Sequence, residues 1–180
     1  MTGFTGRMMG AARLEVAVYE EVEADTTATL QAMAVVILAS IAAGIGSVGV
    51  GPGGVRSIVM SGVGSLAGWV IWAFMTYVIG TKLLPEPQTQ ADTGQLMRTL
   101  GFAQAPGIGR IFVGVPAIGP LVLLIVSLWM LVAMIIAVRQ ALDYKSTWRA
   151  LAVCVIGWVI AIVIPAIALV ATGAPVGDGF

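Results

Sequence analysis

The chain has 180 residues, of which 59% are hydrophobic and 10% are charged, so it carries more apolar surface than a water-soluble domain can bury. Its formal net charge is zero, which gives no reason to expect nucleic acid as a partner. It contains no histidine and a single cysteine, Cys154, so a disulfide framework within the chain is excluded, and we expect no metal or other cofactor.

An apolar stripe near the N-terminus predicts one amphipathic helix over residues 8 to 24, lying on the membrane surface. Its opposite side is acidic, unlike the basic faces that bind anionic lipid. The first residues lack the apolar core of a signal peptide, so we expect residues 1–28 to form a cytoplasmic segment before the first span. The stripe consists of Met9, Ala12, Val16 and Tyr19, and the acids include Glu20, Glu23 and Asp25.

Five apolar segments predict an all-α, polytopic bundle with five transmembrane spans within residues 29–171, followed by an external tail at residues 172–180. The second span contains a GxxxG pattern from Gly64 to Gly68, and small residues at this spacing let membrane helices approach closely. The predicted spans cover about residues 30–50, 58–79, 98–119, 121–138 and 148–171.

The third segment, Arg98 to Pro120, contains three prolines and five glycines, which predicts a broken helix. Non-helical backbone at membrane depth must be covered by protein or line a water-filled cavity, so the other spans should surround it. Asp92 with Gln95 resembles a capping box, which predicts a helix start near Thr93. Alternatively, this segment joins residues 121–138 in one long kinked helix. Its stripe of small residues, expected at a helix contact, is Gly101, Ala105 and Gly109.

Positive charges in short loops predict the orientation, because such loops stay in the cytoplasm. With five spans and a cytoplasmic N-terminus, the outer segments carry only Arg56, and the C-terminus lies outside. The cytoplasmic segments then carry Arg7, Arg13, Lys82, Arg98, Arg139, Lys145 and Arg149.

Gln104 and Arg110 form a candidate intramembrane polar site in the third span. An arginine at the bilayer centre costs roughly 2.5–3.5 kcal/mol, so its presence there indicates a function. The alternative is that the span is shifted by a turn and that Arg110 snorkels to the outer interface.

The acidic side of the N-terminal helix faces the same compartment as several arginines. One hypothesis is that this helix docks on the basic loops through ion pairs, which would need several pairs because each surface pair contributes only about 0–1 kcal/mol. A second is that it forms a partner-binding face, and a third is that it is merely solvated. The residues concerned are Glu20, Glu23, Asp25, Arg98, Arg139 and Arg149.

The hexapeptide Gly101-Phe102-Ala103-Gln104-Ala105-Pro106 resembles the GYxxxP element of the Yip-domain family, with Phe102 in place of tyrosine. The order of other motifs over residues 15 to 170 is also similar to bacterial-type members. These motifs are the acidic stretch Tyr19 to Asp25, the span openings at Arg98 and Arg149, Trp129, and the end of span four at Arg139 to Leu142. We assign Phe102 and Pro106, with the small-residue stripe beside them, to helix packing.

The resemblance implies a five-span integral membrane protein with a cytoplasmic N-terminus. Eukaryotic members of the family are tied to Rab-type GTPases, vesicle traffic and membrane shaping. Their cytoplasmic DLYGP element is missing here, so we do not expect a Rab-type GTPase as a partner.

Two functions remain open at this point. The first is a non-enzymatic scaffold or accessory subunit of a larger bacterial membrane complex, respiratory or photosynthetic, in contact with lipids and other integral membrane proteins. The second is a small transporter or channel that uses the broken third span, as discontinuous helices do in transporters. An enzyme has the least support, because the chain offers no histidine for a Ser–His or metal mechanism.

Overall fold

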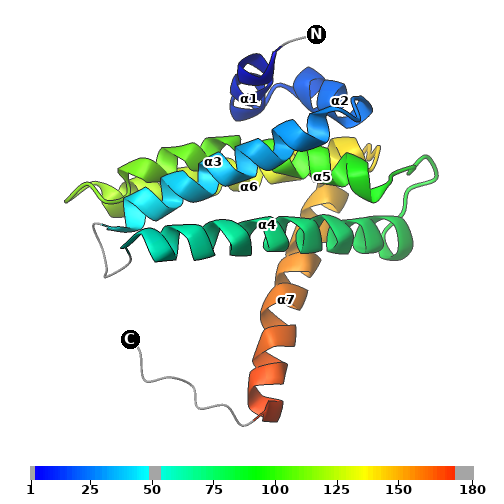
Figure 1. Ribbon diagram of the computed structural model, residues 1–180. Coiled ribbons are helices and arrows are strands. Elements are labelled where there is room, and N and C mark those ends of the chain that lie inside the picture. The colour runs from blue at the N-terminus through cyan, green and yellow to red at the C-terminus, as the bar shows by residue number, and fades with distance from the viewer. Residues whose placement is uncertain (1–2, 49–53, 173–180) are drawn as a thin grey trace.

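The computed structural model describes residues 3–48 and 54–172, and every regular element in this part of the chain is helical. Figure 1 shows α3, α4 and α6 alongside one another, with α1 and α2 packed on one side of them. Residues 173–180 of the predicted external tail and residues 49 and 50 of the predicted first span lie outside the described residues. The elements are α1 (Phe4–Ala12), α2 (Val16–Ala24), α3 (Ala28–Val48), α4 (Gly54–Val78), the π-helical η1 (Ile79–Leu83), α5 (Thr93–Phe102), the 3-10 helix η2 (Ala105–Phe112), α6 (Gly119–Ala141) and α7 (Thr147–Thr172).

Four helices of the described chain contain segments long and apolar enough to cross a membrane. In Figure 1, α7 runs across the other three instead of alongside them. The start of α7 packs against α6, α4 and η1, whereas its later residues, such as Ile162 and Ile164, are more than half exposed. The four segments are Ala28–Ser47, Gly62–Leu83, Gly119–Ala141 and Thr147–Ile164.

The proline- and glycine-rich stretch is not one continuous helix. The helix α5 begins at Thr93, as predicted, because the Asp92 carboxylate accepts from the Gln95 amide at 2.9 Å and the Gln95 side chain accepts from the Asp92 amide at 2.7 Å. It ends at Phe102, and η2 follows with Pro106 in its first turn, where no backbone donor is needed. Residues 113–118 separate η2 from α6, so the alternative of one long kinked helix is wrong.

The prediction of a single amphipathic helix over residues 8 to 24 is also wrong. The chain reverses between α1 and α2 at Leu14, which has a φ of 64°, a left-handed conformation that is unusual for leucine. Two distant donors occupy the last carbonyls of α1: the Tyr19 hydroxyl donates to Ala11 at 3.0 Å, and the Trp129 indole donates to Ala12 at 2.8 Å. These tertiary hydrogen bonds favour the break and hold α1 against α6.

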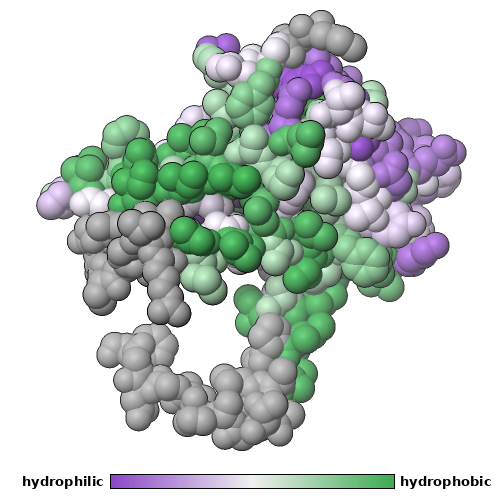
Figure 2. All heavy atoms as spheres, in the orientation of Figure 1, coloured by the Kyte–Doolittle hydropathy of each residue, from purple (hydrophilic) through white to green (hydrophobic). Residues whose placement is uncertain are grey.

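The core lies at one end of the bundle, where α2 packs against α5 and α6. Figure 2 shows that hydrophilic residues gather over the same end, around α2 and the connection that precedes α5, whereas the rest of the visible face is mostly hydrophobic. The molecule therefore has a polar end with a well-packed interior and a more apolar body. The largest fully buried side chains include Tyr19, Leu96, Leu100, Phe102 and Leu142.

Candidate functional site

A cluster around Arg7 joins the first three helices, and sequence reasoning missed it. Arg7 is 3% exposed, and its Nη2 lies 3.0 Å from a Glu21 carboxylate oxygen and 2.7 Å from an Asp25 carboxylate oxygen. Its Nη1 donates to the Gln31 side chain at 3.2 Å. We call Arg7, Glu21, Asp25 and Gln31 the Arg7 cluster. It fixes α1 on α2 and on the start of α3.

Asp25 has a second role at the start of α3. Its carboxylate accepts hydrogen bonds from the amide and the hydroxyl of Thr27, and these bonds, together with Arg7, lower the pKa of Asp25. The sequence hypothesis paired Asp25 with the basic loops, but the structure pairs it with an arginine of the same N-terminal segment. Charge alone could not identify this partner, because Arg7 lies 18 positions before Asp25.

In the part of the chain that the structure describes, the helix α2 docks on α5 and α6 through hydrogen bonds and not through ion pairs of its own acids. Arg98 is buried and donates through Nε to the carbonyl oxygens of Val22 and Glu23, both at 3.1 Å. The Gln95 side chain donates to the Glu23 carboxylate at 3.2 Å, and Gln140 donates to Glu20 at 2.9 Å. The helix α2 therefore contacts α5 and α6 through these hydrogen bonds, whereas the docking hypothesis invoked ion pairs with the basic loops.

Two further arginines of the predicted ion-pair set have other partners. Arg139 donates through Nε to the Tyr144 carbonyl at 3.2 Å, which closes the turn after α6. Arg149 lies 3.3 Å from a Glu86 carboxylate oxygen and also donates to the Pro85 carbonyl. Arg139 therefore acts within the α6–α7 turn, and Arg149 joins that turn to the connection before α5, so neither bond holds α2.

A tyrosine in the α6–α7 turn strengthens this second contact. The buried hydroxyl of Tyr144 lies 3.0 Å from the Gly80 carbonyl and 2.8 Å from the Leu84 carbonyl. The Lys145 amide donates to the Glu86 carboxylate at 3.1 Å, which contributes most to lowering the pKa of Glu86. No sequence pattern singled out Tyr144, since its acceptors are some 60 residues away in the chain.

Glu23 is an acid of α2 whose pKa is raised substantially. Burial between α2 and α5 raises the pKa of Glu23 to about 7, and the nearby charges of Asp143, Glu20 and Asp92 act in the same direction. Arg98 opposes the shift only partly. The docking face therefore contains a carboxyl that changes its protonation near neutral pH.

The small-residue stripe of α5 and η2 lies against neighbouring helices. An added Cβ at Gly101 would lie 2.7 Å from the Ala32 Cβ on α3, and one at Gly109 would lie 2.9 Å from a Val126 methyl on α6. Phe102, Ala105 and Pro106 of the family-like hexapeptide are buried beside them. These residues hold the broken stretch between α3 and α6.

The GxxxG residues of α4 are placed differently. Gly64 and Gly68 are exposed, and no described atom lies within 4 Å of a Cβ added at either position. Neither glycine makes a close helix contact within the described chain, and Gly64 faces away from it.

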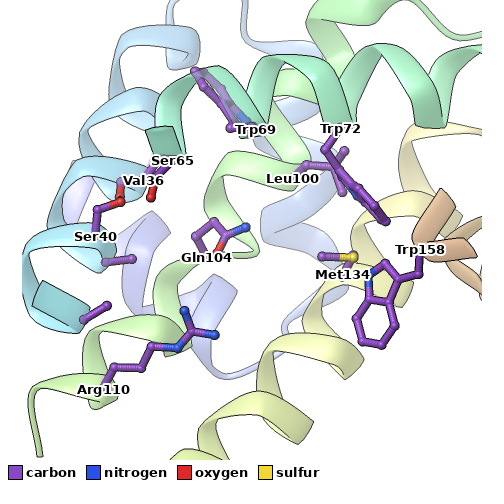
Figure 3. A pocket seen from close by; sticks show the side chains of 13 residues that line it. Val36, Ser40, Ser65, Trp69, Trp72, Leu100, Gln104, Arg110, Met134 and Trp158 are labelled. Carbon is purple, nitrogen blue, oxygen red and sulfur yellow. The ribbon is translucent and has the colours of Figure 1, made fainter. Parts of the chain in front are cut away.

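A cavity of about 310 Å³ lies between α3, α4, α5, η2, α6 and α7. Both residues of the candidate intramembrane polar site line it, and Figure 3 shows the Arg110 guanidinium pointing towards Gln104. Ser40 and Ser65 supply hydroxyl groups, and three tryptophans supply most of its aromatic lining. Arg110 is only partly exposed, so the structure places its side chain toward the interior instead of fully extended into the surroundings.

Most of the chain matches the model of a known protein family. The family model described as the Yip1 domain matches residues 16–168, which extends from the start of α2 to near the end of α7. No curated protein and no solved structure matches the chain. The helices from α2 to α6, most of α7, the four apolar segments and the buried hexapeptide fall within the matched region, whereas α1 precedes it. The chain is therefore a membrane protein that belongs to the Yip1 domain family.

Proposed function

We propose that this protein is a non-enzymatic membrane scaffold or accessory subunit that binds another integral membrane protein through the outward face of α4. One observation carries the proposal: Gly64 of the GxxxG pattern is exposed, does not line the cavity, and has no described atom within 4 Å of a Cβ added to it. Within a bilayer, helices associate by close packing over small residues, because lipid removes the hydrophobic driving force between them.

The surroundings of these glycines fit a helix contact. Val63, Ile71 and Phe74 on α4 are each more than half exposed, and Ala67 lies between the two glycines on the exposed side. A partner helix could lie over the glycines while its side chains interlock with these larger residues. By contrast, the small residues of α5 and η2 are already occupied by α3 and α6.

Gentle-detergent purification from native membranes, with mass spectrometry of the co-eluting subunits, tests the proposal. The wild type should carry one membrane protein in a fixed ratio, and Gly64→Leu should reduce that ratio at least about tenfold, since this corresponds to a loss of only about 1.4 kcal/mol. Ser127→Leu is the matched control, because it enlarges an exposed small residue on α6. A lone wild-type monomer, or equal loss in both variants, would refute the scaffold role.

The proposal includes five membrane passages, with the α5–η2 stretch as the broken third. Ten α-helical residues span about 15 Å and eight 3-10 residues about 16 Å, which together match a hydrocarbon core of about 30 Å. Cysteines at Pro87 and Pro116, in a Cys154→Ser background, lie just outside the two ends of this stretch. Labelling from opposite sides of the membrane supports a crossing, and labelling from one side rejects it.

The orientation proposed is a cytoplasmic N-terminus and an external C-terminus in a bacterial cytoplasmic membrane. Support comes from Arg7, Arg98, Arg139 and Arg149, which all belong to the polar end around α2 and the adjoining turns, as positive charges of cytoplasmic segments do. In such a bilayer α7 would turn about residues 142–146 to run beside α4 and α6. The partners are membrane lipids and an integral membrane subunit, not a Rab-type GTPase.

The cavity favours a second candidate function, a small transporter or channel. Polar groups enclosed by a discontinuous helix are the usual setting of a transport site. Liposome flux of small anions, compared between wild type and Arg110→Ala, separates the two functions. Flux that depends on Arg110 would reject the scaffold function in favour of a transporter. Flux equal to that of protein-free liposomes would favour the scaffold function.

A further inference from the structure

Two polar atoms on the wall of the 310 Å³ cavity described above are buried without a hydrogen-bond partner. They are Nε of Arg110 and Nε1 of Trp72, and they are the only such side-chain atoms among the described residues. Both residues line the same cavity. Trp69, one turn earlier on α4, lines it too but donates its indole N–H to the Met97 carbonyl at 2.9 Å. The unmet hydrogen bonds are therefore concentrated at this cavity.

The charge of the cavity is also unbalanced. Arg110 forms no ion pair within the described chain, and none of the described residues that line the cavity is acidic. A buried donor without a partner costs about 1–3 kcal/mol, and more when it is charged. Water could satisfy the hydrogen bonds, but it cannot neutralise the guanidinium. A negatively charged group would do both.

The chemistry of the wall specifies that group further. The guanidinium presents a planar fork of donors, which matches the paired oxygens of a carboxylate or phosphate. Gln104 can donate beside it, because the guanidinium points towards Gln104 in Figure 3. Ser65 lines the same cavity farther from Arg110, and Ser40 already donates to the Val36 carbonyl at 2.7 Å. The remaining wall is largely apolar, with Trp158 and Met134 opposite Arg110 in Figure 3. A cavity of this composition suits an oxyanion attached to an apolar body.

We infer that the cavity binds the oxyanion group of an amphiphilic ligand, with Arg110 and Trp72 as its donors. The volume of about 310 Å³ lies at the lower end of the range for small-molecule sites, so it holds a head group and the first part of an apolar chain, with the rest extending between the helices. The inference does not depend on the proposed scaffold role. Gly64, on which that role depends, does not line the cavity, and ligand binding is measured on the purified chain without a partner.

Binding to the purified protein in dodecyl maltoside micelles, whose detergent carries no oxyanion, tests the inference with three probes. Palmitate and phosphatidylglycerol represent membrane-borne oxyanions, and inorganic phosphate represents a water-soluble one. We expect wild type to bind palmitate or phosphatidylglycerol, and Arg110→Gln to weaken that binding about ten- to a hundredfold, the effect of one charged hydrogen-bonding group. Arg13→Gln removes the same charge from an exposed site and should leave binding unchanged.

A second variant keeps the test valid if Arg110→Gln fails to fold. Trp72→Phe keeps an aromatic ring near Gly157 on α7 but lacks the indole N–H, and it should weaken binding about three- to tenfold. Each ligand that binds should raise the melting temperature of wild type and not that of Arg110→Gln. Binding of inorganic phosphate alone would reject the claim that the ligand is amphiphilic. No binding of any probe, or equal binding by Arg110→Gln and wild type, would reject the claim that the cavity is a binding site.

Discussion

The contact between Gly101 and Ala32 gives a quantitative test of how the broken stretch is held. A Cβ at Gly101 would lie 2.7 Å from the Ala32 Cβ and 3.2 Å from two of its backbone atoms. Ala32 is fully buried on α3 and has no flexible side chain that could move aside, so α3 and α5 must separate. Overpacking of this kind costs about 1–3 kcal/mol.

Gly64 provides a matched control for Gly101→Ala. Replacing a helical glycine with alanine gains roughly 0.5–1 kcal/mol in either helix, so this gain largely cancels between the two variants. Because no described atom lies within 4 Å of a Cβ at Gly64, Gly64→Ala adds no steric term within the described chain. The difference in unfolding free energy between the variants should therefore be close to the overpacking cost alone, about 1–3 kcal/mol.

Thermal unfolding in one detergent measures this difference. For a chain of this size each kcal/mol corresponds to about 2–4 °C, so Gly101→Ala should melt about 2–12 °C below Gly64→Ala. Gly64→Ala should melt at or slightly above the wild-type temperature. Equal melting temperatures for the two variants would show that α5 does not pack on α3 through Gly101, and the account of the broken stretch would fail.

Three further predictions concern the polar end of the molecule. Arg7→Met should speed hydrogen exchange of the α1 amides about tenfold or more, because the Arg7 cluster is lost, whereas Arg13→Met, whose arginine is exposed, should not. Since the pKa of Glu23 is raised to about 7, its protonated form stabilises the fold below pH 4.5 and this contribution is lost as the pH rises through 7. The melting temperature should therefore fall between pH 5 and pH 8 in wild type but much less in Glu23→Gln. Tyr144→Phe leaves two carbonyls without their donor and should lower the unfolding free energy by about 1–3 kcal/mol in the same melting assay.

Local signals predicted the helical content and several boundaries well. The capping box at Asp92 and Gln95 fixes the start of α5, because both partners are three residues apart and need no tertiary help. Pro106 and the glycines around it similarly mark where regular α-helix ends. Such features depend on neighbouring residues alone, so the sequence is sufficient to find them.

The features that sequence reasoning missed depend on distant partners. The break at Leu14 lies in a stretch without proline, and it is stabilised by donors from Tyr19 and from Trp129, the latter 117 residues away from its acceptor. Charge counting could not choose among the arginines, so the ion-pair hypothesis included Arg139 and Arg149, which have other partners, and left out Arg7. Spacing alone likewise could not tell that Gly101 faces inward and Gly64 outward.

Photo-cross-linking in native membranes tests the central claim, partner binding at α4, most directly. A photoreactive residue at Ala67, on the exposed side of α4, should give one discrete adduct with the same membrane protein that co-purifies in a fixed ratio. The adduct should disappear in Gly64→Leu, and the same probe at Ser127 on α6 should react only with lipid. If Ala67 also yields only lipid adducts, α4 has no protein partner and the scaffold account is contradicted.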